Sequence, residues 1–298
     1  MSEDFYGLRT RSIGNKFLHL DYLTDAGPRI VRLMLGESNE NWMAELPNNV
    51  VETEFGAFHF YGGHRLWHSP EELPRTYFPD SQAVVVETLS DGVRLVQPIA
   101  EPHTGIRKSI EIHLHSDRAA LTLVHRLQNE GKQAVEFAPW AITQLKQGGI
   151  AILPQNLGPV DKTGLLPNRQ LVIWPYTRLH DPRLELQDDL VLIRALPLTP
   201  PCKIGYFNRR GWAGYLQSGT LLLKHFAVQS ASAYPDHGCN VEVYCNDQFI
   251  EVETLGPLAK LLPGDSTTEE ETWDFHTGLG GAQTIEAVRS LVGKLHLE

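Results

Sequence analysis

The spacing of two glutamates, Glu251 and Glu253, suggests acid–base chemistry. They alternate with Ile250 and Val252, so in a β-strand both carboxylates point to the same face. Neighbouring carboxylates repel each other, which favours a raised pKa for one of them and suits it to act as a general base. The alternative is a solvated strand face, against which the apolar residues in between and the Gly-Pro turn that follows both argue.

Residues 61–71 combine two glycines with side chains that could bind a polar ligand. Gly62 and Gly63 permit a tight turn with positive φ, and Pro70 ends regular structure. The side chains that follow the predicted turn can bind an anion, form hydrogen bonds with hydroxyl groups or stack on a ring. These side chains are His64, Arg65, Trp67 and His68. We therefore predict a loop here, which either forms the rim of a ligand site or caps the core with its tryptophan.

Residues 137–144 form a second stretch of this kind, in which Trp140 and Thr143 are candidates for contacting a ligand. Pro139 lies within the predicted strand, and a proline at such a position indicates an edge or a bulge where the backbone can face a cleft. The competing interpretation is that Trp140 is an ordinary core aromatic.

Residues 233–240 are turn-forming by composition, yet they gather tyrosine, aspartate, histidine and asparagine side chains. A lysine lies on the predicted strand before them. The candidates for ligand contact in this region are Lys224, Tyr234, Asp236, His237 and Asn240. The alternative is a plain turn in which the aspartate caps its own backbone.

The elements that must position these residues are β-strands. Apolar and polar residues alternate in short runs separated by turn residues, most clearly over residues 110–127, and this pattern predicts antiparallel strands. Only residues 284–296 carry a helical apolar stripe, and residues 154–169 and 181–189 are predicted loops. We expect one all-β domain over residues 1–298, with roughly fifteen to twenty strands in two large packed antiparallel sheets and a short C-terminal helix.

The composition argues against nucleic-acid-binding and membrane-spanning functions. The 298 residues are 42% hydrophobic and 21% charged, which suits a globular chain with a sizeable core. The net charge of -10 disfavours nucleic acid and anionic membranes as partners, and no apolar run approaches the roughly 20 residues of a spanning helix.

Three cysteines without CxxC spacing and an acidic N-terminus without an apolar signal favour a cytoplasmic protein with reduced thiols. No metal or cofactor motif is present, so neither is expected, and the pattern does not predict an oligomeric state.

Taken together, these stretches resemble the galactose mutarotase-like superfamily, and within it most closely the uncharacterised branch known as DUF4380. The resemblance spans nearly the whole chain and is carried by residues 26–30, 62–71, 138–143, 234–240, 251–258, 262–264 and 271–273. It implies a β-supersandwich whose concave sheet binds a sugar. In the family's enzymes a carboxylate takes the proton from the anomeric hydroxyl and a histidine protonates the ring oxygen, so that the ring opens and closes on its other face.

The resemblance also implies roles for particular residues. Glu253 matches the place of the family's catalytic carboxylate best, with Glu251 as the alternative. Arg65 falls in the region of the family's Asn-Arg substrate pair and is a candidate donor to sugar hydroxyls. Trp67 and Trp140 would stack on the sugar ring.

The chain departs from the family at the acid histidine. The strand that should carry it, predicted over residues 137–145, contains no histidine. Either His64, His68 or His237 supplies the proton from another direction, or the protein binds a sugar without epimerising it.

We therefore expect a carbohydrate-binding protein of the aldose 1-epimerase type, which interconverts the anomers of a hexose or related sugar by general acid–base catalysis. Its expected partner is a small-molecule sugar or sugar derivative. A non-catalytic sugar-binding module is the alternative. A lyase for acidic polysaccharides is a further alternative, which needs a tyrosine or histidine base and an electropositive cleft, and the acidic net charge counts against it.

Overall fold

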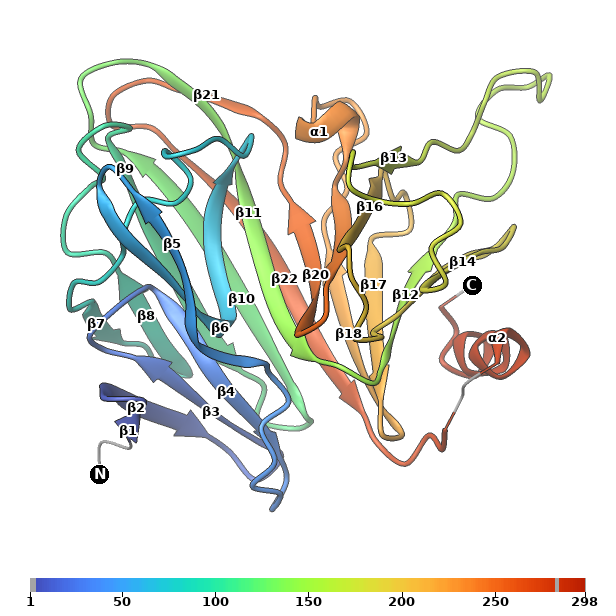
Figure 1. The fold of residues 1–298 in the computed structure, drawn as a ribbon, viewed down its shortest axis with the longest axis horizontal. Helices are drawn as coiled ribbons and strands as arrows, with labels where there is room; N and C mark the ends of the chain where they lie inside the picture. The colour runs from blue at the N-terminus through green and yellow to red at the C-terminus, as the bar shows by residue number, and fades with distance from the viewer. Residues whose placement is uncertain (1–3, 282–283, 298) are drawn as a thin grey trace.

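The computed structural model describes residues 4–281 and 284–297, and within them the strands form two large antiparallel sheets (Figure 1). The 12-stranded sheet has the order β1 (Asp4–Phe5), β2 (Leu8–Gly14), β3 (Leu18–Leu23), β4 (Arg29–Leu35), β6 (Gly56–Ser69), β11 (Val135–Lys146), β20 (Phe249–Leu255), β19 (Val241–Cys245), β16 (Cys202–Tyr206) and β13 (Val172–Ile173), with β5 (Glu45–Thr53) paired to β6 and β21 (Ala259–Leu261) paired to β11. The 10-stranded sheet has the order β14 (Leu184–Leu186), β15 (Leu190–Arg194), β12 (Ile150–Pro154), β17 (Trp212–Gln217), β18 (Thr220–Phe226), β22 (Ser266–His276), β10 (Ala120–Asn129), β9 (Ile106–Leu114), β8 (Gly92–Val96) and β7 (Val85–Thr88). The prediction of an all-β fold with two large antiparallel sheets is confirmed.

The described strands number 22, more than the sequence predicts. The surplus comes from β1, β13, β14 and β21, each only two or three residues long. A period of two cannot be recognised in so short a run. One of these strands, β14, lies inside residues 181–189, which are predicted to be a loop.

The main core lies between the two sheets, because each strand turns one set of alternate side chains inward. Leu20 and Ile250 from the large sheet and Ile112 and Leu123 from the small one belong to this cluster, and all four are fully buried. Burying such side chains is the main stabilising term of the fold. The sheets are therefore held together by the same alternation that the sequence displays.

A second apolar cluster lies on the other face of the small sheet, under the C-terminal helix α2 (Ile285–Lys294). Val288, Leu291 and Val292 of the helix pack there against the strands, beside β12 and β14 in Figure 1. The Thr284 hydroxyl caps the helix by accepting a hydrogen bond from the Ala287 amide. The predicted C-terminal helix is confirmed, and its regular part ends at Lys294. No helix among the described residues is long and apolar enough to cross a membrane.

Residues 61–69 are not a loop, because they continue the long strand β6. Gly62 and Gly63 have φ values of +92° and +73°, and they mark the place where β6 leaves its partner β5 and begins to pair with β11. A Cβ atom would lie 2.0 Å from the Ala44 carbonyl oxygen at Gly62 and 1.9 Å from the Ile30 carbonyl oxygen at Gly63. The two glycines thus allow neighbouring backbone to approach β6 closely, instead of forming a turn.

Candidate functional site

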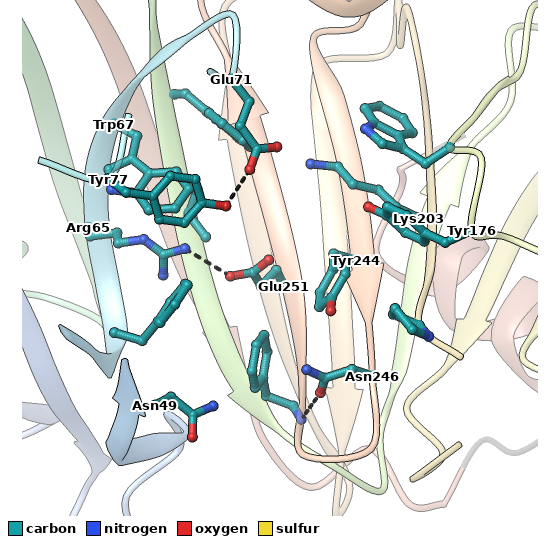
Figure 2. Close-up of a pocket in the computed structure, with 16 residues that line it drawn as sticks. Asn49, Arg65, Trp67, Glu71, Tyr77, Tyr176, Lys203, Tyr244, Asn246 and Glu251 are labelled. Atoms are coloured by element: carbon teal, nitrogen blue, oxygen red, sulfur yellow. Dashed lines mark hydrogen bonds and ion pairs between the residues drawn. The ribbon is translucent and has the colours of Figure 1, made fainter. Parts of the chain in front are cut away.

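A pocket of about 420 Å³ lies on the face of the large sheet that points away from the main core (Figure 2). Its volume falls within the range of about 300–1,000 Å³ that is usual for small-ligand sites. Strands β6, β11, β20, β19 and β16 contribute its floor, and the loops after β6 and β13 contribute its walls. Figure 2 shows Arg65, Trp67 and Tyr77 on one side, Lys203 and Tyr176 on the other, and Glu251 and Tyr244 between them.

Strand register places the polar groups of the floor in a row. Gly63, Gln144, Glu251, Tyr244 and Lys203 are consecutive partners across the neighbouring strands β6, β11, β20, β19 and β16. Directly paired residues share one face of a sheet. The row therefore brings a carboxylate, a phenol and an ammonium group to the same surface.

The next row contains the second glutamate. Arg65, Ile142, Glu253, Glu242 and Gly205 are partners across the same five strands. Gly205 leaves space in this row, since a Cβ there would lie 2.7 Å from Cγ of Glu242. Glu251 and Glu253 thus lie on one face, as their spacing requires, and Glu242 lies beside them.

Glu251 is held from two sides. Its Oε1 accepts hydrogen bonds from Arg65 Nη2 at 3.0 Å and from Gln144 Nε2 at 2.9 Å, and neither contact uses Oε2. Burial raises the pKa of Glu251 to about 7, and the opposing effect of Arg65 is not sufficient to cancel this shift. A carboxyl group with such a pKa exchanges its proton readily near neutral pH.

Glu253 is fully buried behind the pocket floor. Its Oε2 accepts hydrogen bonds from Trp140 Nε1 at 2.7 Å and from Lys203 Nζ at 2.9 Å, and Lys203 Nζ also lies 2.7 Å from Glu242 Oε2. Burial raises the pKa of Glu242 to about 8. Burial alone would lower the pKa of Lys203, but the two carboxylates outweigh it and raise that pKa well above its ordinary value. Lys203 therefore remains an ammonium group that fixes Glu253 and Trp140.

Of the thirteen residues predicted to form the site, four line the pocket, namely Arg65, Trp67, Trp140 and Glu251. Glu253 supports two of the lining residues from behind, and Asp236 lines an adjoining cavity. The other seven predicted residues line neither cavity.

His64, Thr143 and Lys224 lie between the sheets, on the opposite face from the pocket. His64 Nδ1 is 3.0 Å from Thr143 Oγ1, which also accepts a hydrogen bond from Lys224 Nζ at 3.1 Å. All three are fully buried. His64 and Thr143 are each one residue away from a pocket residue, Arg65 and Ile142, so strand alternation turns these two inward. Lys224 points inward from β18 of the small sheet.

The same internal cluster contains the one triad, among the described residues, whose ligand atoms lie close enough to hold a metal ion: His64, His125 and Glu271, within 4.8 Å of one another. Hydrogen bonds already engage these groups. His64 Nε2 is 2.7 Å from His125 Nε2, and Glu271 accepts from Trp273 Nε1 at 2.8 Å and pairs with Lys224 at 2.9 Å. The contacts describe a satisfied buried polar network.

His68 belongs to a different buried cluster. Its Nε2 lies 2.9 Å from Glu101 Oε2, and Lys108 Nζ lies 2.7 Å from Glu101 Oε1. Although His68 follows Trp67 directly, it points to the other face of β6. Its ring is therefore tied to the core and does not face the pocket.

Tyr234, His237 and Asn240 shape the turn around the short helix α1 (Pro235–Gly238). The Tyr234 hydroxyl accepts a hydrogen bond from a main-chain amide, and the Asn240 side chain bonds twice to the main chain of Asn208. His237 is exposed and takes part through its carbonyl oxygen, which accepts from Gln170. No histidine is found among the described residues that line the pocket.

Several pocket residues escape the sequence analysis, namely Glu71, Tyr77, Trp174, Tyr176, Lys203, Tyr244 and Asn246. One of them, Tyr244, had a usable signal. Glu242 and Tyr244 alternate with the buried Val241, Val243 and Cys245, just as the two glutamates alternate with apolar residues on β20. The remaining ones could be found only from the order of strands in the sheet, which a single sequence does not reveal.

Comparison with solved structures finds this architecture elsewhere at low sequence identity. A galactose mutarotase-like protein from Lactobacillus casei is 11% identical with a TM-score of 0.59, and the match covers 90% of this chain and 100% of that one. A candidate aldose 1-epimerase from Escherichia coli K12 is 14% identical with a TM-score of 0.56, covering 91% and 100%. A TPR-domain-containing protein from Parabacteroides distasonis is 16% identical with a TM-score of 0.61, and the match covers 90% of this chain but 47% of that one, so this chain spans about half of its length.

No protein-family model and no curated protein matches the sequence, so the resemblance to the DUF4380 branch is not shown. At identities of 11–16%, the similarity to these solved structures shows the fold alone. Their architecture agrees with the strand order and the paired sheets described above. The chain therefore has the fold of the galactose mutarotase-like proteins.

Proposed function

We propose that this protein binds a sugar or sugar derivative in the pocket over β6, β11, β20 and β19. The observation that carries the proposal is the pairing of aromatic faces with free donors in one pocket. Trp67, Trp140 and Tyr77 line it together with the Arg65–Glu251 pair. A sugar ring has apolar C–H faces, which can pack on the aromatic rings, and a rim of hydroxyl groups, which can form hydrogen bonds with the arginine and the carboxylate.

The donors on the Arg65 side have capacity left for a ligand. Arg65 Nε, Arg65 Nη1 and Trp67 Nε1 are buried without a hydrogen-bond partner in the protein. The Arg65 guanidinium lies over the Trp67 ring, with its carbon 4.3 Å from the ring centroid, so its orientation is fixed before a ligand arrives. All three atoms are covered, so a small movement of Arg65 and Trp67 would be needed for the hydroxyl oxygens of a bound sugar to reach them. Such contacts would satisfy N–H groups whose burial without a partner is otherwise unfavourable.

Titration calorimetry with a panel of hexoses, their methyl glycosides and their disaccharides tests this proposal. Arg65→Lys keeps a positive charge beside Glu251 but removes the forked guanidinium donors, so it should weaken binding at least about tenfold. Arg289→Lys is the matched control, because Arg289 lies on α2 and pairs there with Asp189. Absence of saturable binding across the panel would rule the proposal out.

A second candidate function, interconversion of sugar anomers, is favoured by Glu251 and Tyr244. Glu251 would accept the proton of the anomeric hydroxyl at Oε2. Burial raises the pKa of Tyr244 to about 12, so this phenol stays protonated and could donate to the ring oxygen, the part that a histidine plays in the family's enzymes. The ring would open, rotate about the bond to the anomeric carbon and close on the other face. Exchange of anomers above the uncatalysed rate, measured by polarimetry or saturation-transfer NMR, distinguishes this activity from binding alone.

The lyase alternative has less support in this pocket. It requires a deprotonated tyrosine or a histidine as base, and burial raises the pKa of the pocket tyrosines Tyr77, Tyr176 and Tyr244. It also requires an electropositive cleft, whereas Arg65 and Lys203 are each paired with a carboxylate. The placement of the chain within the DUF4380 branch and its organisation as one domain over residues 1–298 remain our proposals.

A further inference from the structure

A second cavity of about 320 Å³ adjoins the pocket. The two share four lining residues, Glu71, Trp140, Trp174 and Lys203. Glu71 and Lys203 mark the upper end of the pocket in Figure 2, whereas Asn49 and Asn246 lie at its lower end and do not line the second cavity. The second cavity therefore extends the pocket in one direction, away from Asn49 and past the shared residues.

The junction between the cavities is aromatic and firmly held. Lys203 Nζ lies 4.6 Å from the centroid of the Trp140 ring and 4.8 Å from that of Trp174. Trp140 also donates its indole N–H to Glu253, so its ring cannot turn without breaking that bond. Two indole rings at this point provide apolar surface for a ligand that passes from one cavity into the other.

The residues that line only the second cavity are Glu72, Leu73 and Asp236. Asp236 and the residue after it adopt φ values of 50° and 58°, a left-handed conformation that is rare outside glycine. Ser69 Oγ donates to Asp236 Oδ2 at 3.3 Å. The turn around α1 thus presents a carboxylate acceptor at the second cavity.

The charges of this region disfavour an acidic ligand. Lys203 is already balanced by Glu242 and Glu253, which leaves Glu71 and Asp236 as carboxylates without a cationic partner at the cavity. Carboxylates accept hydrogen bonds from hydroxyl groups and repel a uronate or a phosphate.

We propose that the second cavity is a subsite for a second, uncharged sugar unit, so that the ligand is a disaccharide or the end of a longer neutral glycan. This inference rests on the proposed sugar binding in the first pocket. It assigns the first unit to the Arg65–Glu251 pocket and the second to the cavity between Leu73 and Asp236. The two indole rings at the junction contact the ligand between the two units.

Titration calorimetry with D-glucose, D-galactose and D-mannose and with cellobiose, lactose and mannobiose tests the subsite. The best disaccharide should bind at least about tenfold more tightly than the best monosaccharide, because it occupies both cavities. Leu73→Trp should abolish this difference by filling the second cavity while leaving monosaccharide affinity unchanged, which also shows that the variant is folded. Leu73 is 64% exposed, and Leu165→Trp is the matched control because Leu165 is 84% exposed on the loop after β12 and lines neither cavity.

Equal affinities for monosaccharides and disaccharides would overturn the second subsite and leave the proposed function standing. Undiminished disaccharide binding by Leu73→Trp would also overturn it. Tighter binding of cellobiouronic acid than of cellobiose would refute the assignment to a neutral unit. Absence of binding by every sugar would overturn the proposed function and this inference together.

Discussion

Glu251 and Tyr244 face each other across the ladder between β20 and β19, on the pocket side of the large sheet. Side chains of directly opposed residues have Cβ atoms about 4.5–5.5 Å apart, so the carboxylate and the phenol can contact one ligand. Arg65 and Gln144 hold Glu251 from its other side. This pair is therefore where acid–base chemistry should be sought, and it contains no histidine.

Removal of the Tyr244 hydroxyl should separate binding from exchange. If Glu251 and Tyr244 catalyse anomer interconversion, Tyr244→Phe should reduce the exchange rate by about 10²–10⁴-fold, because it removes the proposed acid. Sugar affinity should change by less than about tenfold, since the ring remains. Saturation-transfer NMR measures exchange, and calorimetry measures affinity.

Tyr176→Phe is the control for that experiment, because Tyr176 lines the same pocket but does not pair with Glu251. Equal losses of exchange in Tyr176→Phe and Tyr244→Phe would show that neither phenol has a specific role. An unchanged rate in Tyr244→Phe would exclude it as the acid.

The pH dependence of exchange should follow Glu251. Its pKa is raised to about 7, and only the carboxylate form can accept a proton, so the catalysed rate should rise through pH 7 and level off above about pH 8. Glu251→Gln should remove the enzyme-dependent rate at every pH. A catalysed rate that is constant between pH 5.5 and 8.5 would contradict the assignment of Glu251 as base.

Part of this site could be predicted from sequence because strand alternation is a local rule. The spacing of Glu251 and Glu253 places them on one face, and the same rule places Trp140 there and turns Thr143 away. The prediction for His64 failed to use this rule, since residues 61–69 were expected to form a loop. Once they are a strand, Arg65 and His64 must point to opposite faces.

The strand order of the sheet was beyond the reach of the sequence. Lys203 lies 50 residues before Glu253 and pairs with it only because β16 and β20 both flank β19. Such pairings depend on the packing of the whole sheet. Residues from the connecting loops, such as Trp174, carry no periodic signal at all.

Gly63 should be indispensable for the register of β6. Gly63→Ala places a Cβ atom 1.9 Å from the Ile30 carbonyl oxygen at a φ of +73°, and we expect it to cost at least about 3 kcal/mol of unfolding free energy. Gly238→Ala is the control, because its φ of +96° is equally unfavourable but no heavy atom lies within 4 Å. It should cost only about 1–2 kcal/mol. Equal losses in urea denaturation would show that backbone conformation, and not the close approach of β4, makes Gly63 necessary.

The buried histidine cluster should make the protein sensitive to acid. Burial, reinforced by His125 and Lys224, holds the pKa of His64 well below its ordinary value. The unfolded chain takes up a proton on this residue below about pH 6.5, whereas the folded protein does not, so the free energy of unfolding falls as the pH drops from there toward the folded pKa. The slope contributed by one such histidine is at most about 1.4 kcal/mol per pH unit. The free energy of unfolding, measured by denaturant titration at several pH values between 7.5 and 5, should therefore fall less steeply with decreasing pH in His64→Gln than in the wild type. This expectation holds whatever the stability of the variant at pH 7.5. The exposed His237 provides the control, since His237→Gln should retain the wild-type dependence of the unfolding free energy on pH. The same dependence in His64→Gln would exclude His64 as a source of the acid sensitivity.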